Sequence, residues 1–351
     1  STTPMMYFAV AKFGYDAGIN ITASHNPKEY NGFKVVRKDA IPLSGESGLF
    51  EIKKIMERES FEKVDKRGSI TKRHDVVESY VKNALSFVNT KSIAHFKVVV
   101  DTANAMGGIV MPKLFDHTEC SMIHMYPELD GSFPNHEANP LKEENLKDLK
   151  KKVVKEGADL GIALDGDADR IMFIDEKGEL VNPDLVTAVL ARSVLKRHPG
   201  AKILYDLRSS WAVREEIEKL GGVAIQCRVG HSLIKEQMRR EKALFGGELS
   251  GHYYFAENYY MESPLIVTLE LLRRLTLEKS TLSAMFKPLK RYYATGEINF
   301  SVKDKDEKLK QLEQSFSNAK RIYHLDGLSV EYEDFWFNVR PSNTEPCLLY
   351  T

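Results

Sequence analysis

The sequence has few cysteines, no excess of either charge and no long apolar run. Its three cysteines, Cys120, Cys227 and Cys347, lie far apart and form no CxxC pair. Their spacing supports neither a zinc site nor a disulfide framework, and it fits a reducing compartment, so we expect a cytoplasmic protein. No stretch reaches the roughly 18 consecutive apolar residues of a transmembrane helix, which argues against a membrane protein.

Positive and negative charges balance over the whole chain. Lys plus Arg and Asp plus Glu each number 50, so the formal net charge is zero at pH 7. A chain without a strong field is not expected to bind nucleic acid or a membrane surface. The 351 residues, 42% of them hydrophobic, are enough for roughly two to four domains with ordinary cores. Because the chain opens without methionine and stops inside an apolar run, we expect both ends to be truncated.

Three aspartates alternate in one short stretch, Asp165, Asp167 and Asp169, and Arg170 follows directly. The apolar residues on either side predict two buried strands with a tight loop between them. Two like charges about 4 Å apart repel by roughly 4 kcal/mol at an effective dielectric near 20. A divalent cation would reverse that sign, and hard oxygen ligands suit Mg²⁺. A solvated acidic turn explains the same residues about equally well.

A second polar loop, residues 22–27, follows the predicted short strand 18–21. Pro27 keeps the residue before it out of helical geometry, so Ser24 and His25 are predicted to lie on a bend. Such a loop would present a hydroxyl at the mouth of a site. An ordinary turn, in which these side chains satisfy backbone groups, is the more common explanation of a single loop serine.

Two further loops carry polar side chains after predicted strands. In residues 246–252, Glu248, Ser250 and His252 alternate, so an extended loop would turn all three the same way, as sugar hydroxyls require; a glycine-rich hairpin is the alternative. In residues 340–346, several donors follow a predicted strand at 335–339 and suit a phosphate, with a proline-bounded turn as the alternative. These donors are Arg340, Ser342, Asn343 and Thr344.

The order of predicted elements is typical of an α/β fold. Leu146, Leu149 and Val153 form the apolar stripe of a helix that Gly157 ends, and this helix leads into the strand before the aspartates. We predict four units, at residues 1–66, 67–176, 177–290 and 291–351. Ligands gather at the carboxyl ends of strands in open α/β sheets. Four such loops facing one cleft would suit phosphoryl transfer on a sugar phosphate.

At this point the sequence resembles the α-D-phosphohexomutase family, and most of all its bacterial phosphomannomutase/phosphoglucomutase members. Residues 22–27 resemble the family's phosphoserine loop, 165–170 its metal loop, 247–252 its sugar loop and 340–346 its phosphate loop, in family order. The resemblance covers essentially the whole chain. It implies three related α/β domains with mixed sheets and a smaller C-terminal α+β domain, with strands missing at both ends.

The resemblance also implies roles for individual residues. Ser24 would be the phosphorylated nucleophile, and its phosphate would bind Mg²⁺ together with Asp165, Asp167 and Asp169. Lys34 is implied as a candidate general acid or base. The residues implied near the transferring phosphoryl group are His25, Lys34, Arg170 and His231. The residues implied to bind the sugar or its other phosphate are Arg208, Glu248, Ser250, His252, Arg340, Ser342, Asn343 and Thr344.

The implied reaction is reversible phosphoryl transfer between the 1- and 6-positions of mannose and glucose phosphates. It would pass through phosphoserine and a hexose 1,6-bisphosphate, which would also serve as activator. We expect hexose phosphates as substrates and a monomer or homodimer. The alternatives are a phosphoglucosamine mutase, an inactive sugar-phosphate-binding fragment and a Mg²⁺-dependent phosphatase with an aspartate nucleophile. Phosphoglucosamine mutases usually carry Gln where Leu249 stands and Gly where Asn343 stands.

Overall fold

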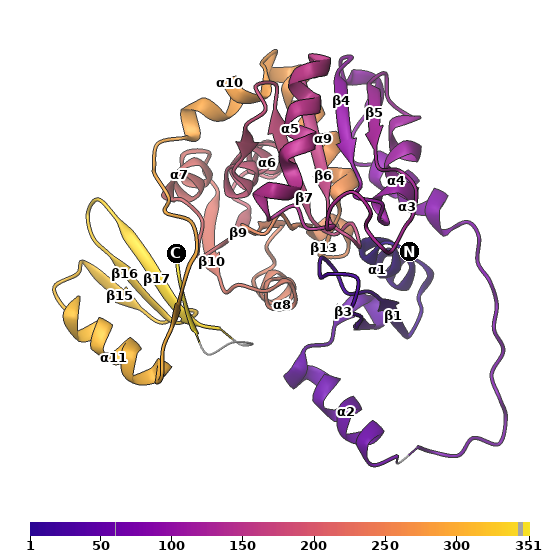
Figure 1. Ribbon diagram of the computed structural model, residues 1–351, viewed down its shortest axis with the longest axis horizontal. Coiled ribbons are helices and arrows are strands. Elements are labelled where there is room, and N and C mark those ends of the chain that lie inside the picture. Colours follow the sequence, from indigo (N-terminus) through magenta and orange to yellow (C-terminus); the bar gives the residue numbers. More distant parts are fainter. Residues whose placement is uncertain (60, 343–346) are drawn as a thin grey trace.

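The computed structural model describes residues 1–59, 61–342 and 347–351, which form four units (Figure 1). The second and third units lie next to each other, and the first unit lies below them in the view of Figure 1. The fourth unit is a separate sheet on the opposite side from the first. Exposed residues 61–75 connect the first unit to the second. The predicted boundary at residues 66 and 67 falls within this segment, and the domain boundaries remain predictions.

The first unit is an antiparallel sheet in the order β1-β2-β3 with α1 packed against it. Thr2 caps the helix through its side chain, Pro4 lies in the first turn, and Gly14 ends it with a φ of 71°. The elements are α1 (Thr3–Phe13), β1 (Ala17–Ile21), β2 (Phe33–Arg37), η1 (Lys38–Ala40), β3 (Ile41–Pro42), η2 (Gly45–Leu49) and α2 (Phe50–Glu57).

The second unit contains a five-stranded mixed sheet in the order β5-β4-β6-β7-β8. Strand β4 pairs in parallel with β5 and β6. Strand β7 pairs antiparallel with both β6 and β8. The predicted stripe of α5 is buried, and Gly157 ends the helix with a φ of 56°. The elements are α3 (Val76–Leu85), η3 (Thr90–Ser92), β4 (Lys97–Asp101), α4 (Gly107–Phe115), β5 (Ser121–Met125), α5 (Glu143–Glu156), β6 (Leu160–Leu164), β7 (Ile171–Asp175) and β8 (Leu180–Val181).

The third unit repeats this pattern of pairing in the order β10-β9-β11-β12-β13. Strand β9 is parallel to β10 and β11, and the last three strands again alternate in direction. The elements are α6 (Pro183–Arg197), β9 (Lys202–Asp206), α7 (Trp211–Lys219), β10 (Val223–Cys227), α8 (His231–Glu241), β11 (Phe245–Gly247), β12 (Tyr253–Phe255), η4 (Ala256–Asn258), β13 (Met261–Glu262), α9 (Pro264–Glu278), α10 (Leu282–Phe286) and η5 (Lys287–Leu289).

One hydrophobic core joins the second and third units. It includes Val98 and Ile162 of one sheet, Ile203 of the other, and buried residues of α6 and α9 such as Val186 and Leu269. In α6, 12 of the 15 residues are buried and in α9, 10 of the 15, whereas a helix on the surface buries only one stripe of side chains. The two sheets are therefore held in one packed body, and loops at the ends of their strands can be held in fixed positions.

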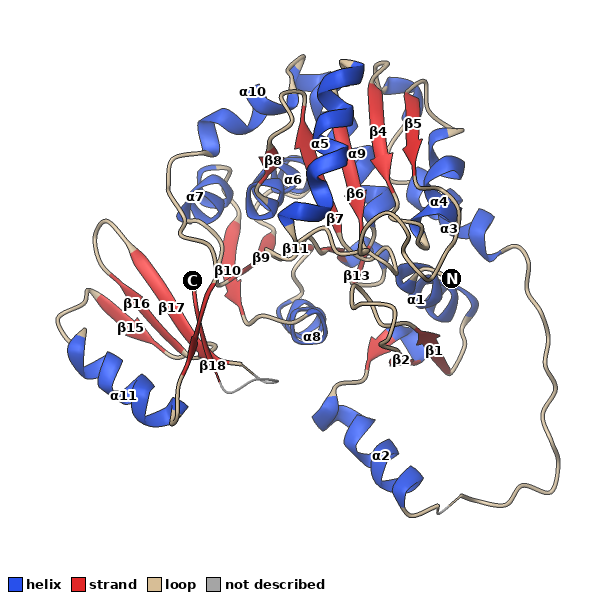
Figure 2. Ribbon diagram, viewed as in Figure 1, coloured by secondary structure: helices blue, strands red, loops and turns tan. Residues whose placement is uncertain are grey.

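The fourth unit is an antiparallel sheet in the order β14-β18-β17-β16-β15 with α11 along one side (Figure 2). Its own core joins Leu328, Val330 and Phe337 of the sheet to Leu312 and Phe316 near the end of the helix. The elements are β14 (Ile298–Ser301), α11 (Lys305–Ser315), β15 (Arg321–Tyr323), β16 (Leu328–Glu331), β17 (Trp336–Pro341) and β18 (Cys347–Tyr350).

One prediction for the fourth unit was wrong in its boundary. Arg340 was predicted to lie in a loop after the strand, but it is a residue of β17. Pairing with β18 extends the strand, because Arg340 lies opposite Leu349 and Pro341 opposite Leu348. Among the described helices of the whole chain, none combines the length and apolar character needed to cross a bilayer.

Candidate active site

The aspartate loop is a tight turn between β6 and β7, as the sequence predicted. The N–H of Ala168 donates to the carbonyl of Asp165, and the N–H groups of Asp169 and Arg170 donate to Asp165 Oδ1 at 3.1 Å. All three aspartates are buried, and one oxygen of each lies within 4.8 Å of the others. The turn thus gathers three carboxylates in a place shielded from water.

Cations and a hydroxyl group surround these carboxylates. Lys34 Nζ, from β2, lies 2.7 Å from Asp167 Oδ2 and 2.5 Å from Asp169 Oδ2. Arg170 Nε lies 3.7 Å from Asp165 Oδ2, and Thr3 donates its hydroxyl to Asp167 Oδ2 at 2.5 Å. Burial opposes the charge of Lys34, but Asp169 and Asp167 outweigh it and hold the Lys34 pKa above its usual range. Lys34 is therefore an ammonium in this arrangement.

Burial and the neighbouring Asp169 raise the pKa of Asp165, whereas Lys34 and His252 overcome burial and hold the pKa of Asp169 below its usual range. Two of the carboxylate oxygens are buried and accept no hydrogen bond from the described residues: Asp167 Oδ1, and Asp165 Oδ2, which has only Arg170 at 3.7 Å. Unpaired buried carboxylate oxygens are costly unless a cation contacts them. The loop therefore fits a divalent cation, and its all-oxygen donor set suits Mg²⁺ rather than a metal that prefers thiolate or imidazole.

The serine loop, residues 22–27 between β1 and β2, lies directly against the aspartate loop. A Cβ at Gly166 would lie 2.3 Å from the carbonyl oxygen of Ser24, so only glycine allows this approach. Ser24 has a φ of 58°, and its Oγ lies 3.1 Å from His25 Nδ1. Burial and Arg170 lower the pKa of His25 to about 4, so its ring is neutral at pH 7 and can accept from the hydroxyl.

The loop at residues 248–252 is the turn between β11 and β12, and it bonds to the aspartate turn. Ile171 donates its N–H to the carbonyl of Gly251 at 3.0 Å. His252 links the two turns, because its Nε2 lies 3.1 Å from Asp169 Oδ1 and its Nδ1 lies 3.1 Å from Glu248 Oε2. Ser250 Oγ lies 2.8 Å from the same Nδ1, so the three alternating side chains do face one another.

The charges around His252 set its protonation. Burial alone would lower the pKa of this imidazole, but Asp169 and Glu248 outweigh burial and raise it to about 9. His252 is therefore charged at neutral pH. His231, the first residue of α8, is also buried, with its ring centroid 6.2 Å from that of His252. Burial and Lys235 hold the pKa of His231 well below its usual range, so the two histidines differ in charge.

Arg208 of the third unit and Arg340 of the fourth unit both approach Glu297, where the chain passes between these two units. Arg208 follows β9 and pairs with Asp206 through its Nε and Nη2, while its Nη2 lies 3.7 Å from Glu248 Oε1. Arg340 Nη2 lies 2.6 Å from Glu297 Oε2. The backbone N–H of Ser342 donates to the carbonyl of Cys347 at 3.0 Å. The predicted residues Asn343 and Thr344 lie outside the described residues.

Two residues that were not predicted from the sequence, Thr3 and Lys235, make buried contacts at or near the site. Thr3 contacts Asp167, and the only local signal for it is the Thr2–Thr3–Pro4 pattern of a helix start. Lys235 Nζ lies 2.6 Å from Glu262 Oε2, and both side chains are fully buried. The same ammonium lies 4.2 Å from the ring centroid of Tyr7 in α1. Lys235 lies four residues after His231, which places both on one face of α8.

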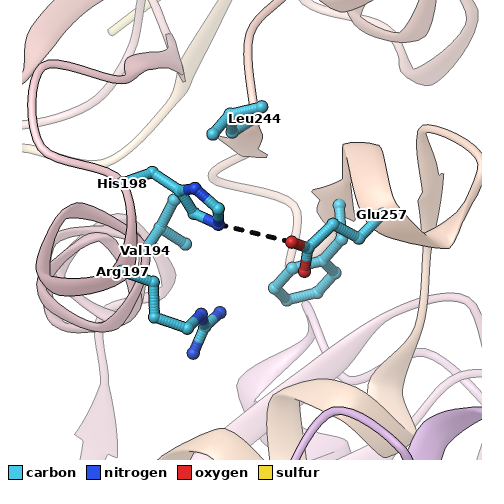
Figure 3. Close-up of a pocket in the computed structure, with 6 residues that line it drawn as sticks. Val194, Arg197, His198, Leu244 and Glu257 are labelled. Atoms are coloured by element: carbon cyan, nitrogen blue, oxygen red, sulfur yellow. Dashed lines mark ion pairs between the residues drawn. The ribbon is translucent and has the colours of Figure 1, made fainter.

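A cavity of about 10 Å³ elsewhere in the third unit contains none of the predicted site residues (Figure 3). His198, directly after α6, faces Glu257 of η4 across it at 3.3 Å, beside Arg197 and Leu244. This volume holds about one water molecule, so it cannot take a sugar phosphate.

Comparisons with known proteins agree with this arrangement of units. Four family models match in succession, and all are described as phosphoglucomutase/phosphomannomutase. They are the alpha/beta/alpha domain I at residues 1–63, domain II at 78–178, domain III at 182–292 and the C-terminal domain at 297–349. The chain therefore belongs to the phosphoglucomutase/phosphomannomutase family of mutase enzymes.

Individual relatives are similar over nearly the whole chain. A phosphomannomutase of Methanocaldococcus jannaschii is 42% identical, with 99% of this chain and 77% of the relative covered. A phosphomannomutase of Escherichia coli K12 is 37% identical, with 99% and 78% covered. The crystal structure of a phosphoglucomutase/phosphomannomutase family protein from Burkholderia thailandensis superposes with a TM-score of 0.89 at 31% identity, covering 99% of this chain and 76% of that one.

Proposed function

We propose that the chain interconverts the 1- and 6-phosphates of mannose and glucose through a phosphorylated Ser24. One observation carries the proposal: three loops from three units lie in direct contact. The carbonyl of Ser24 lies against Gly166, and Asp169 bonds to His252 of the turn that also holds Glu248 and Ser250. A nucleophile, a cation site and a set of sugar-binding groups are therefore adjacent, as phosphoryl transfer to a sugar hydroxyl requires.

The reaction consists of two successive phosphoryl transfers. Phosphoserine gives its phosphoryl group to the free hydroxyl of a hexose phosphate, so the Ser24 Oγ–P bond breaks and a sugar O–P bond forms. The sugar hydroxyl loses its proton to a base, and the departing Ser24 Oγ gains one. The hexose 1,6-bisphosphate turns over and returns its other phosphoryl group to Ser24. The product is the isomeric hexose monophosphate, and the enzyme is again phosphorylated.

The chain's own residues supply positioning and charge. Asp165, Asp167 and Asp169 would hold Mg²⁺, which when bound neutralises charge on the transferring group. The Lys34 ammonium and Arg170 lie at the same place and add positive charge. Neutral His25 can exchange a proton with Ser24 Oγ, because its Nδ1 lies 3.1 Å away. Lys34, tied to two carboxylates, suits charge neutralisation here better than proton transfer.

Substrate range follows from how little of a ring the sugar loop can contact. Glu248 and Ser250 lie close together beside His252, a spacing that suits two adjacent hydroxyls, and the family resemblance implies those on carbons 3 and 4, which leaves carbon 2 without a contact. A ring position that the protein does not contact contributes little to specificity. Glucose and mannose phosphates should therefore be converted with kcat/KM values within about tenfold of each other. Glu248→Ala should impair both reactions together. A preference above about a hundredfold, or loss of one reaction alone, would show that carbon 2 is contacted.

Peptide mapping of the purified chain tests the proposal most directly. Phosphate should be found on Ser24, and Ser24→Ala should abolish turnover while binding of glucose 1-phosphate remains measurable. A phosphatase with an aspartate nucleophile would instead carry phosphate on an aspartate of the 165–169 turn. Full turnover by a carefully purified Ser24→Ala protein would remove Ser24 from the mechanism.

A further inference from the structure

Glu297 forms ion pairs with Arg208 of the third unit and Arg340 of the fourth. Its Oε2 lies 2.6 Å from Arg340 Nη2 and 3.9 Å from Arg208 Nη1. Glu297 directly precedes β14, at the point where the chain passes from the third unit to the fourth. One carboxylate therefore links an arginine of the third unit to an arginine of the fourth.

The same donors are those that a phosphate would use. A guanidinium presents a planar fork of N–H groups that fits either a carboxylate or a phosphate. Arg340 is nearly buried, and its Nη1 has no hydrogen-bond partner among the described residues. Its Nη2 already contacts Glu297. An anion that reaches Arg340 thus meets one unpaired donor and one donor that a carboxylate occupies.

Charge makes this overlap matter. The carboxylates of Asp206, Glu248 and Glu297 offset the charges of the two arginines and of His252, which pairs with Glu248, so the cluster has no net positive charge before any ligand enters. A phosphate dianion would be repelled unless one carboxylate moved away.

Of the three carboxylates, Glu297 is the one that can move. Asp206 is fully buried and accepts from the backbone N–H groups of Arg208 and Leu249. Glu248 is buried and accepts from the Tyr254 hydroxyl at 2.9 Å. The Glu297 side chain is 39% exposed and follows residues 291–296, which are exposed and form neither helix nor strand.

We infer that Glu297 is a tethered competitor for the phosphate subsite. In the free protein, the Glu297 carboxylate pairs with the guanidinium of Arg340. When a hexose phosphate binds, its non-reacting phosphate displaces this carboxylate. The inference rests on the proposed function, because it requires Arg340 to bind phosphate. In the free protein, Glu297 links the third and fourth units; after displacement, the bound ligand makes this link instead. Glu297 would thus set the affinity for phosphate.

Isothermal titration of the full chain with inorganic phosphate and with glucose 1-phosphate tests this inference. Glu297→Gln keeps the shape of the side chain and removes its charge. We expect it to bind both ligands roughly fivefold more tightly, the effect of losing one partly exposed ion pair. Glu333→Gln is the matched control, because Glu333 is exposed in the same unit and pairs with Lys320. It should bind as the unaltered chain does.

The direction of the change separates competition from a structural role. If Glu297 merely held the fourth unit in place, Glu297→Gln would bind phosphate more weakly, and that result or an unchanged affinity would overturn the inference. In an Arg340→Ala background, Glu297→Gln should lose more than half of its effect. If Arg340→Ala alone bound phosphate normally, the proposed role of Arg340 would fail. An Arg340→Ala defect with no gain in Glu297→Gln would reject the competitor and leave the proposed function standing.

Discussion

The second and third units place the same kind of turn at the same point of identically ordered sheets. In the second unit Ala168, with a φ of 52°, donates its N–H to the carbonyl of Asp165 at 3.1 Å. In the third unit Gly251, with a φ of 86°, donates to the carbonyl of Glu248 at 3.0 Å. Each turn begins with an acid and carries further polar side chains two and four positions later.

The side chains on these turns suit different ligands. The second unit offers three carboxylates, which suit a hard cation. The third offers a carboxylate, a hydroxyl and an imidazole that bond to one another and suit sugar hydroxyls. The shared backbone therefore decides where a ligand can lie, and the residue types at alternate positions decide what it can be.

The second and third units also differ in the length of the segment that joins β5 to α5 and β10 to α8. In the second unit residues 126–142 separate β5 from α5, and the carbonyl of Ala138 accepts from the N–H of Gly166. In the third unit residues 228–230 alone separate β10 from α8. The long connection covers the aspartate turn, whereas the short one places His231 beside the site.

The first prediction tests whether the candidate cation site belongs to the second unit alone. Asp167→Asn removes one charged ligand, so the affinity for Mn²⁺, measured by calorimetry as a probe for Mg²⁺, should fall about a hundredfold or more. Ser250→Ala, at the corresponding position of the third unit, should change it less than about twofold. An unchanged Mn²⁺ affinity in Asp167→Asn would make the loop an ordinary acidic turn.

The second prediction contrasts lysines on the corresponding helices α5 and α8. Lys235→Met leaves Glu262 buried without its partner, and we expect a loss of about 3–5 kcal/mol in unfolding free energy. Lys150→Met, which removes an ion pair with the exposed Glu143, should cost less than about 1 kcal/mol. Hydrogen exchange of α8 and α5 measures both.

A double variant checks the cause of the Lys235 effect. Lys235→Met with Glu262→Leu removes both charges and should recover most of the lost stability, because apolar groups can replace a buried ion pair. If the double variant were less stable than Lys235→Met alone, packing rather than the unpaired charge would explain the loss.

The third prediction concerns the left-handed position of each turn. Gly251→Ala places a side chain at positive φ with its Cβ 2.9 Å from the carbonyl of Ile171, so it should cost about 1–3 kcal/mol. Ala168→Gly relieves the same backbone strain but adds chain entropy, so it should lie within about 0.5 kcal/mol of neutral. Urea denaturation compares the two variants, and equal destabilisation would contradict the proposed equivalence of the turns.

The smallest expected effect distinguishes the residues that end β4 and β9. Asp101 pairs with His136 at 3.0 Å, whereas Asp206 pairs with Arg208. Burial would lower the pKa of His136, but the bond to Asp101 outweighs burial and raises it above the usual 6.5. The pair therefore adds stability below pH 6.5, and this stability is lost as the pH rises through the raised pKa.

Melting temperatures at several pH values test this difference. The difference in melting temperature between the unaltered chain and His136→Gln should be larger at pH 6 than at pH 8.5. The corresponding difference in unfolding free energy should stay below about 1 kcal/mol. The pair in the third unit should show no such change over this range, because an arginine keeps its charge. A gap that grew with pH would reverse the assigned protonation.

Much of the site could be predicted from local sequence. The aspartate turn was predictable because three charges interrupt apolar strands, whereas residues 248–252 form the turn of the antiparallel pair β11–β12, which is the hairpin alternative and not the extended loop. The start of α4 has no clear signal in the sequence, because it begins with two glycines, residues 107 and 108, directly after a turn. The extension of β17 through Arg340 depends on pairing with β18, which no local pattern reveals.

Contacts between distant segments were beyond sequence reasoning. Thr3 bonds to Asp167, 164 residues away, and Lys235 to Glu262 in another element. Periodicity cannot predict either contact, because both depend on how the units dock. The implied positions of Ser24, Glu248 and Arg340 came from a resemblance of motifs, and their roles remain predictions that the experiments above address.

The bonds between the turns also bear on the order of events during folding. Asp169 meets His252, and Ile171 meets Gly251, only after both sheets have formed and docked. A ribosome would have to synthesise the chain beyond residue 252 before these bonds could close, although the aspartates are complete much earlier. Contacts between distant residues form slowly because long loops must close first. During refolding, we therefore expect native-strength cation affinity to develop late, as a kinetic marker of docking rather than of sheet formation.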